Sequence, residues 1–115
     1  MIRKANEMAV ENREHMRDGE GTVAVTQVFA NDEMTSTTRL CAKLTLVKGA
    51  SIGIHTHLDE DEIYYILSGR GIVDDTLTQT EVGVGDAVLT GNGESHSISN
   101  PFDETLELLA VVIKY

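Results

Sequence analysis

The sequence predicts an all-β fold, a sandwich or barrel built from short strands. Val, Ile and Thr make up more than a quarter of the 115 residues, and these β-branched side chains favour strands because their χ1 angle is restricted. The ten glycines fall mostly in close pairs between runs that alternate apolar and polar residues. Short alternating runs separated by turn residues are typical of β-sandwiches and β-barrels.

Nine strands are predicted along the chain, with a polar loop at residues 31–38. The strands span residues 22–30, 39–47, 51–57, 62–67, 71–75, 77–81, 86–90, 95–99 and 105–113. A sheet of this size tends to close or to split into two packed sheets, because either arrangement removes exposed edges.

Residues 1–18 are the only stretch that could be helical. Their apolar period is weak and no clear cap is present, so an extended arm is equally compatible with this sequence. We therefore expect an N-terminal arm, residues 1–20, followed by one β-barrel domain, residues 21–115, since the length fits a single domain.

Charge and cysteine content exclude several classes of partner and site. The formal net charge is −10, whereas nucleic-acid binding needs a basic face, so no nucleic acid is expected. Cys41 is the only cysteine, which rules out an internal disulfide and a paired-cysteine zinc motif. Residues 1–17 resemble no signal peptide, and the longest apolar run, residues 108–113, is too short to span a bilayer. We expect a cytoplasmic protein without a membrane partner.

Three of the four histidines fall in a pattern that could hold a metal. His55 and His57 are two residues apart on a predicted strand, so both imidazoles face the same side of the sheet. Glu62 opens the next strand after a short connection, and His96 follows a glycine turn on a later strand. An isolated pair of histidines on a strand is more often a surface pair. Three imidazoles and a carboxylate together make a divalent-metal site plausible.

The spacing of these residues resembles the two motifs of the cupin superfamily. The first motif reads Gly49-x5-His55-Thr56-His57-x4-Glu62-x6-Gly69 and the second Gly85-x5-Gly91-Asn92-Gly93-x2-His96-x3-Asn100, with Gly91 where the family has proline. The runs EIYYILSGRG and GNGESHSISN are similar to small single-domain, cupin 2 type bacterial proteins described as oxalate-decarboxylase-like. The resemblance covers about residues 40–113.

The resemblance implies a double-stranded β-helix, or jelly-roll, cupin barrel. It also implies that His55, His57, Glu62 and His96 hold one divalent transition metal per chain inside the barrel mouth. Manganese is the first expectation for that metal, with iron, nickel, cobalt or zinc as alternatives. Four protein ligands on an octahedral ion leave two adjacent positions for water or a chelating ligand.

Two functions are compatible with such a site. In the first, the protein is a metal-dependent enzyme of decarboxylase, dioxygenase or isomerase type that acts on a small carboxylate, keto acid or sugar derivative. In the second, the metal anchors a small ligand without turnover, and the protein is a binding or sensor module. The cupin fold hosts both kinds of protein.

Strand alternation extends the site to its walls. Tyr64 and Ile66 share the face of Glu62, and Ile98 shares the face of His96. Tyr64 is therefore a candidate catalytic residue and pocket wall, or simply part of the barrel core. Arg39 is either a partner for a ligand carboxylate or, more often for its type, a surface residue. Residues 59–61 are expected to form a solvated acidic loop whose potential opposes anionic ligands.

A homodimer is also expected. Residues 108–113 are apolar on both faces of the final strand, so one face meets the interior and the other needs a cover. The N-terminal arm of the same chain or of a partner could supply that cover.

Overall fold

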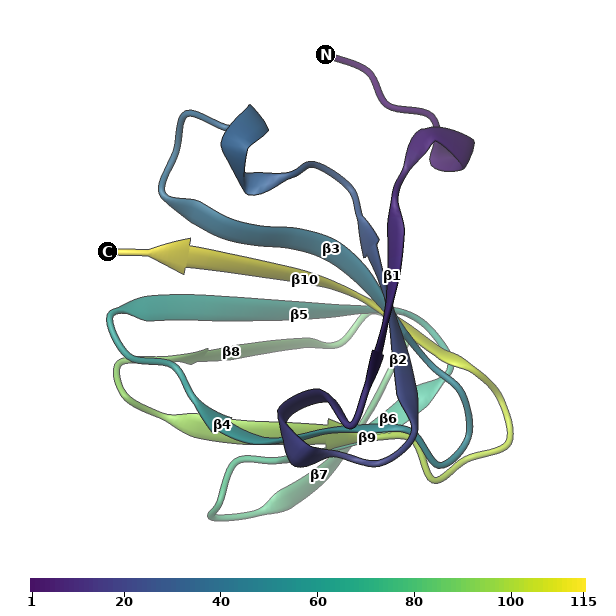
Figure 1. Ribbon diagram of the computed structural model, residues 1–115. Helices are drawn as coiled ribbons and strands as arrows, with labels where there is room; N and C mark the ends of the chain where they lie inside the picture. The colour runs from purple at the N-terminus through teal and green to yellow at the C-terminus, as the bar shows by residue number, and fades with distance from the viewer.

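The computed structural model describes residues 1–115 and contains ten antiparallel strands in two sheets (Figure 1). One sheet has six strands in the order β1-β2-β3-β10-β5-β8, and the other has four in the order β4-β9-β6-β7. The strands are β1 (Val10–Glu14), β2 (Thr22–Gln27), β3 (Thr38–Leu46), β4 (Ser51–Thr56), β5 (Glu60–Ser68), β6 (Arg70–Asp74), β7 (Gln79–Gly83), β8 (Ala87–Gly91), β9 (Ser95–Ser99) and β10 (Leu106–Lys114). The only helices are single 3-10 turns, η1 (Ala5–Glu7), η2 (Met16–Asp18) and η3 (Asn31–Glu33). The predicted all-β class is confirmed.

All nine predicted strands are present, with ends that differ from the prediction by at most three residues. The tenth strand, β1, was not predicted because it carries no alternating apolar pattern. Four of its five residues are exposed, and its backbone pairs in register with β2, from Val10 opposite Thr26 to Glu14 opposite Thr22. The arm is therefore extended and interrupted by single turns, the second of the two conformations that the sequence allows.

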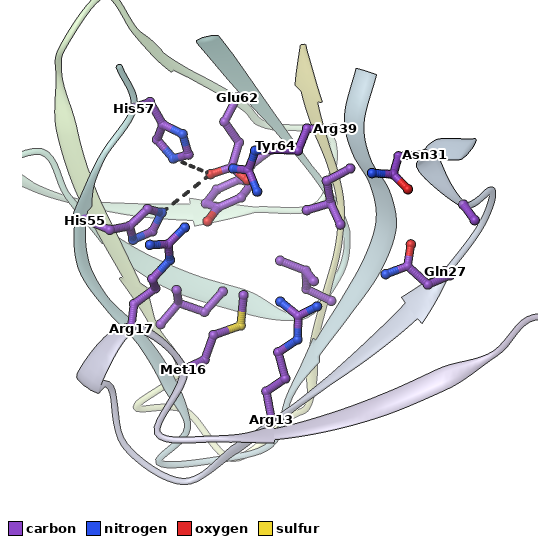
Figure 2. A pocket seen from close by; sticks show the side chains of 14 residues that line it. Arg13, Met16, Arg17, Gln27, Asn31, Arg39, His55, His57, Glu62 and Tyr64 are labelled. Atoms are coloured by element: carbon purple, nitrogen blue, oxygen red, sulfur yellow. Dashed lines mark ion pairs between the residues drawn. The ribbon is translucent and has the colours of Figure 1, made fainter. Parts of the chain in front are cut away.

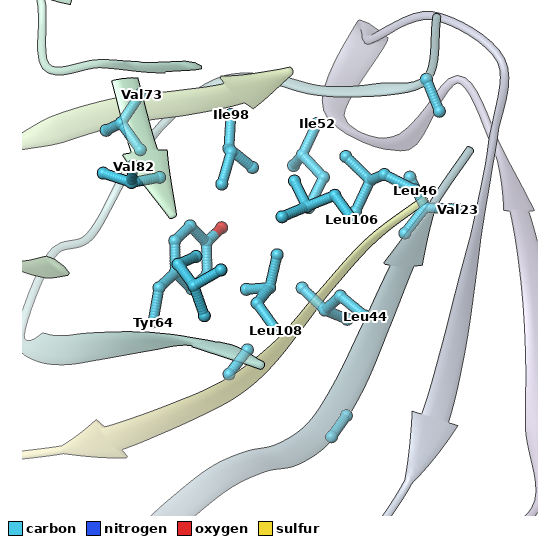
Figure 3. Close-up of a cluster of buried hydrophobic side chains, with 14 of the residues drawn as sticks. Val23, Leu44, Leu46, Ile52, Tyr64, Val73, Val82, Ile98, Leu106 and Leu108 are labelled. Carbon is cyan, nitrogen blue, oxygen red and sulfur yellow. The ribbon is translucent and has the colours of Figure 1, made fainter. Parts of the chain in front are cut away.

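The hydrophobic core lies between the two sheets, where alternate residues of each strand point inward (Figure 3). On β10, Leu106, Leu108 and Ala110 are fully buried, whereas Leu109 between them is only partly buried. Strand β5 continues this core with Tyr64 and Ile66. The inward face of β5 also carries carboxylates toward one end of the barrel, so the apolar core and the polar site share one face of one strand.

The arm packs on the four-stranded sheet through close backbone contacts. A Cβ atom on Gly53 of β4 would overlap the carbonyl oxygen of Arg17, and a Cβ atom on Gly19 would overlap the carbonyl oxygen of Ser51. Only glycine permits backbones to approach this closely. Turn η2 consequently packs on β4 and lies beside the mouth of the barrel.

The beginning of the arm is held by Arg3. Its guanidinium forms a bidentate ion pair with Glu33 of η3, with both N–O distances 2.7 Å, and lies over the ring of Phe29. The arm is thus attached at η3, along β2 and on β4.

The outer face of the six-stranded sheet carries exposed apolar side chains on β5 and β8. Ile63, Tyr65 and Leu67 on β5 are 38%, 43% and 45% exposed, and Leu89 on the edge strand β8 is 68% exposed. The chain's own arm pairs with β2 and packs on β4, so it does not supply the cover that the sequence allowed for this face. No helix of the structure has the length or the hydropathy of a membrane span.

Candidate metal centre and pocket

Four side chains from both sheets converge inside the barrel mouth. His55 lies on β4, His57 follows directly after that strand, Glu62 lies on β5 and His96 lies on β9. Each residue offers one possible ligand atom, and these atoms all lie within 4.8 Å of one another. The structure thus brings together the four residues that the sequence analysis selected, and this cluster could hold a metal ion.

A bulge in β4 determines the direction of its histidines. Ile52 pairs with Ile98 of β9, but His55, three residues later, pairs with His96, only two residues before Ile98. The extra residue reverses the alternation, since Ile54 is 55% exposed whereas Ile52 and His57 are buried. His55 and His57 face the same side as predicted, and the bulge makes that side the interior.

The three imidazoles point their Nε2 atoms toward Glu62. The Oε1 atom of Glu62 lies 2.9 Å from the Nε2 atoms of His57 and His96 and 3.7 Å from that of His55. Figure 2 shows the contacts of Glu62 with His55 and His57. The Nε2 atom of His96 is 3.1 Å from the Nε2 atom of each of the other two histidines. Four donor atoms are therefore aimed at one small volume.

The outer nitrogen of each ring has its own partner. His55 Nδ1 lies 2.7 Å from the carbonyl oxygen of Gly53, His57 Nδ1 lies 3.3 Å from Glu60 Oε1, and His96 Nδ1 lies 2.8 Å from the hydroxyl of Thr90. The carbonyl and the carboxylate accept hydrogen bonds, so they favour a proton on Nδ1 of His55 and His57 and leave the Nε2 lone pairs free.

The charge of the cluster is concentrated on Glu62. Burial alone would raise the pKa of this carboxyl, but hydrogen bonds from the three imidazoles, with a proton rather than a metal on Nε2, hold it well below its usual value. Hydrogen bonding to Glu62 raises the pKa of His57, whereas burial lowers the pKa of His96. Glu62 is thus ionised, and its negative charge requires a cation or a proton beside it.

Tyr64 lies directly beneath the cluster. Its ring stacks on that of His96, with 5.0 Å between the centroids and an interplanar angle of 16°. The side chain is 1% exposed. Burial and the negative charge of Glu62 raise the pKa of its hydroxyl, so this group stays neutral and can donate a hydrogen bond. Tyr64 belongs both to the core and to the pocket wall, which reconciles the two interpretations of its position.

The cluster opens into a pocket of about 340 Å³. Its apolar wall includes Met16, Leu40, Leu44 and Ile52 but not Ile66 and Ile98, which belong to the core. The expectation that these two isoleucines line the mouth is therefore wrong. Alternation places them correctly on the inner face, but it does not give their depth along the barrel.

Three arginines also line this pocket, namely Arg13, Arg17 and Arg39. Arg17 extends from η2 toward His55 and Tyr64 (Figure 2), and its positive charge partly offsets the rise in the pKa of Tyr64. It forms no ion pair with any side chain of this chain, whereas Arg13 is paired with Glu11 and Arg39 with Glu60. Arg17 is thus the arginine of the pocket that has no ion-pair partner in this chain.

The expectation that residues 59–61 form a solvated acidic loop is wrong for Glu60. Its side chain is buried at the start of β5, where it accepts hydrogen bonds from Arg39 at 2.8 and 3.1 Å. This pair holds the pKa of Glu60 below its usual value. Arg39 is therefore neither a free surface residue nor a free partner for a ligand, because it orients the carboxylate that contacts His57.

Sequence reasoning missed Glu60 and the two arginines of the arm. Glu60 could have been found, because it shares strand parity with Glu62 and Tyr64. Arg13 and Arg17 have no such signal. Their positions follow from contacts between β1 and β2 and between η2 and β4, which no local pattern reveals.

Comparisons with known proteins agree with this architecture. Residues 42–112 match the family model described as "Cupin domain". The chain is 39% identical over 113 residues to the "Oxalate-binding protein" of Thermotoga maritima, an alignment that covers 98% of this chain and 93% of the relative.

Solved structures extend the agreement. A crystal structure described as a predicted oxalate decarboxylase from Thermotoga maritima superposes with a TM-score of 0.95 at 38% identity, covering 100% of both chains. A cupin-2 domain from Rhodospirillum rubrum superposes with a TM-score of 0.78 at 18% identity, covering 98% of this chain and 73% of the other. The predicted jelly-roll barrel with a short N-terminal arm is confirmed.

Proposed function

Because the chain belongs to the cupin family, we propose that it binds one divalent transition metal through His55, His57, Glu62 and His96. Three imidazoles and a carboxylate suit manganese, iron, nickel, cobalt and zinc. Manganese is the first candidate, since the remaining positions would be filled by oxygen atoms, which Mn²⁺ accepts readily.

The donor set fits a cation on physical grounds. The Nε2 atoms of His96 and His55 lie 3.1 Å apart, and two unprotonated nitrogens at this distance repel each other unless a positive charge lies between them. Hydrogen bonds from Nδ1 to Gly53 and Glu60 keep the imidazoles of His55 and His57 in the tautomer that binds metals. Glu62 then contributes the negative charge.

The ligand that we propose is a small carboxylate held against this metal. When bound, the metal supplies a Lewis acid with open positions for a chelating pair of oxygens. Arg17, which has no ion-pair partner in this chain, carries the proposal, because its guanidinium can pair a carboxylate with two hydrogen bonds. The oxalate-binding relative supports oxalate as the first compound to test.

A carboxylate ligand is also compatible with the charge of the pocket. The whole chain is acidic, but Arg13 and Arg39 of the pocket are paired with Glu11 and Glu60, and Arg17 balances the charge of Glu62. A bound divalent cation would then make the local potential positive and attractive to an anion, contrary to what the acidic sequence around Glu62 suggests.

In the first form of this proposal, the protein is a metal-dependent enzyme that converts its ligand. Tyr64 would then donate a hydrogen bond to the reacting ligand. The second candidate is a binding or sensor module without turnover. One observation favours this candidate: apart from the cluster, the titratable groups of the pocket are arginines and Tyr64, whose raised pKa prevents it from acting as a base near neutral pH.

The experiment combines elemental analysis with calorimetry. We expect about one metal per chain after incubation with Mn²⁺ and dialysis, and we expect oxalate to bind the loaded protein but not protein treated with a chelator. A protein that stays metal-free after incubation with Mn²⁺, Fe²⁺, Ni²⁺ and Zn²⁺ would refute the metal site. Product analysis with oxalate, α-keto acids, uronates and catechols then separates the two candidates, because an enzyme converts one of them and a binding module converts none.

Metal affinity is expected to decrease as the pH falls below about 6, since imidazoles with reference pKa values near 6.5 then take up protons that compete with the ion. Metal content after equilibration at a series of pH values measures this competition. A metal content that stays constant down to the range where only carboxylates titrate would contradict histidine ligation.

A second copy of this chain is the partner that we propose for the exposed face of β5. Ile63, Tyr65 and Leu67 form an apolar row on this face, and β8 beside it is an unpaired sheet edge. A two-fold contact would cover the row of one protomer with that of its partner. Light scattering at micromolar concentration should report a dimer, and Tyr65→Glu should shift it toward monomer. A monomeric wild-type protein would refute this assembly.

A further inference from the structure

The pocket has a second polar end, away from the imidazoles. Arg13 of β1, Gln27 at the end of β2 and Asn31 of η3 line the same pocket as the metal cluster. Figure 2 shows all three on the opposite side of the pocket from His57 and Glu62. The side-chain amides of Gln27 and Asn31 form no hydrogen bond with any other group of the chain, so both are available to a ligand.

Arg13 supplies the charge at this end. Its Nε and Nη2 atoms contact the carboxylate of Glu11 at 3.1 and 3.3 Å, which leaves Nη1 without a partner. Glu11 is largely exposed, with a side-chain exposure of 61%, so water screens this ion pair and weakens it. A ligand carboxylate inside the pocket can therefore share or replace Glu11 as the partner of Arg13.

The part of the pocket between the two ends is apolar. Met16 lies between Arg17 and Arg13 in Figure 2, and the buried side chains of Leu44 and Ile52 belong to the same lining. This order of polar, apolar and polar groups matches a ligand with two oxygen-rich ends and an aliphatic middle.

The size of the pocket leads to the same class of ligand. Its volume of about 340 Å³ lies in the range of roughly 300–1,000 Å³ that is typical of small-molecule sites. Oxalate consists of two carboxylates joined directly. Bound at the metal cluster, it would leave most of this volume, including the whole end around Arg13, to solvent.

We infer that the pocket is built for a dicarboxylate longer than oxalate, with an α-keto or α-hydroxy acid at the metal and a second carboxylate at Arg13, Gln27 and Asn31. This inference rests on the proposed function, because the first end of the ligand uses the metal cluster and Arg17. It adds a subsite that selects ligands by their length and by the charge of their far end.

The test compares two keto acids that differ only at that far end. Calorimetry on the Mn²⁺-loaded protein would measure 2-oxoglutarate and 2-oxopentanoate, which has a methyl group in place of the second carboxylate, with oxalate as the reference ligand. We expect 2-oxoglutarate to bind at least about tenfold more tightly than 2-oxopentanoate, as a charge-assisted hydrogen bond would provide.

Two substitutions separate the ends of the pocket. Arg13→Met should bring the ratio of the two affinities close to one, and Arg13→Lys should restore part of it. Arg17→Met should weaken both keto acids by a similar factor and preserve the ratio. Circular dichroism and metal content check that each variant is folded and loaded.

The outcomes distinguish this inference from the proposed function. Equal affinities for the two keto acids, in a protein that binds oxalate, would overturn the subsite and leave the metal-carboxylate function in place. A preference that survives Arg13→Met would overturn the role of Arg13. If the loaded protein binds none of the three acids, the proposed function fails and the subsite fails with it.

Discussion

The barrel and the N-terminal arm contribute different parts of one pocket. The barrel supplies the four candidate metal ligands and their hydrogen-bond partners, all on strands or in the short turns between them. The arm supplies Arg17 beside His55, Arg13 at the far end of the pocket and Met16 between them. Under the proposed function, substitutions in the arm should therefore weaken ligand binding without loss of the metal, whereas substitutions of the candidate metal ligands should abolish both.

The largest expected effect is the loss of metal from a substitution within the barrel. Glu62→Gln removes the only negative charge among the four candidate ligands, so the metal content should fall from about one per chain to nearly none, as measured by elemental analysis. Glu81→Gln, at an exposed carboxylate on the surface, is the matched control and should keep the metal. Full metal content in Glu62→Gln would show that Glu62 is not a ligand.

Glu60→Gln should weaken the metal without abolishing it. The substitution removes the charge that orients His57 and leaves Arg39 without its ion-pair partner, and changes of this kind lower metal affinity by roughly 10- to 100-fold. Competition with a metal indicator measures the effect. Asp61→Asn changes the neighbouring carboxylate, which contacts the Tyr115 hydroxyl instead, and an equal loss in this control would argue against a specific role for Glu60.

Gly53→Ala should act on the arm. The new Cβ atom would overlap the carbonyl oxygen of Arg17, so η2 must move away from β4, at a cost of about 1–3 kcal/mol in the free energy of unfolding. We expect weaker oxalate binding with the metal retained, together with a lower midpoint in denaturant. Gly83→Ala is the control, because a Cβ atom there would meet nothing closer than 4.0 Å. Unchanged oxalate affinity in Gly53→Ala would separate the arm from the ligand site.

Tyr64→Phe should have the smallest effect. The ring keeps its stacking on His96 and its place in the core, so metal content should be unchanged. Loss of one neutral hydrogen bond should weaken ligand binding, or slow turnover, by roughly fivefold. A variant that loses its metal would show that the hydroxyl supports the cluster rather than the ligand.

The sequence allowed far more to be predicted for the barrel than for the arm. Strand alternation and joint spacing were enough to select His55, His57, Glu62 and His96, because side chains two residues apart on a strand must share a face. The bulge between Ile52 and His55 was not predicted, although it decides which face is inside.

The arm shows why the rest could not be predicted. Strand β1 consists mainly of exposed polar residues and is held by backbone pairing with β2, so it lacks the apolar alternation by which strands are recognised. Arg17 reaches the pocket because Gly53 and Gly19 allow two backbones to touch. Contacts of this kind join segments distant in the sequence, and neither composition nor periodicity records them.

One measurement tests the division between barrel and arm most directly: calorimetric titration of oxalate into Arg17→Met protein of known Mn²⁺ content. We predict a metal content equal to that of the wild-type protein and an oxalate affinity lowered by about tenfold, because a charge-assisted pair is lost while the four candidate metal ligands are untouched. Loss of the metal, or wild-type affinity for oxalate in the loaded variant, would contradict the account.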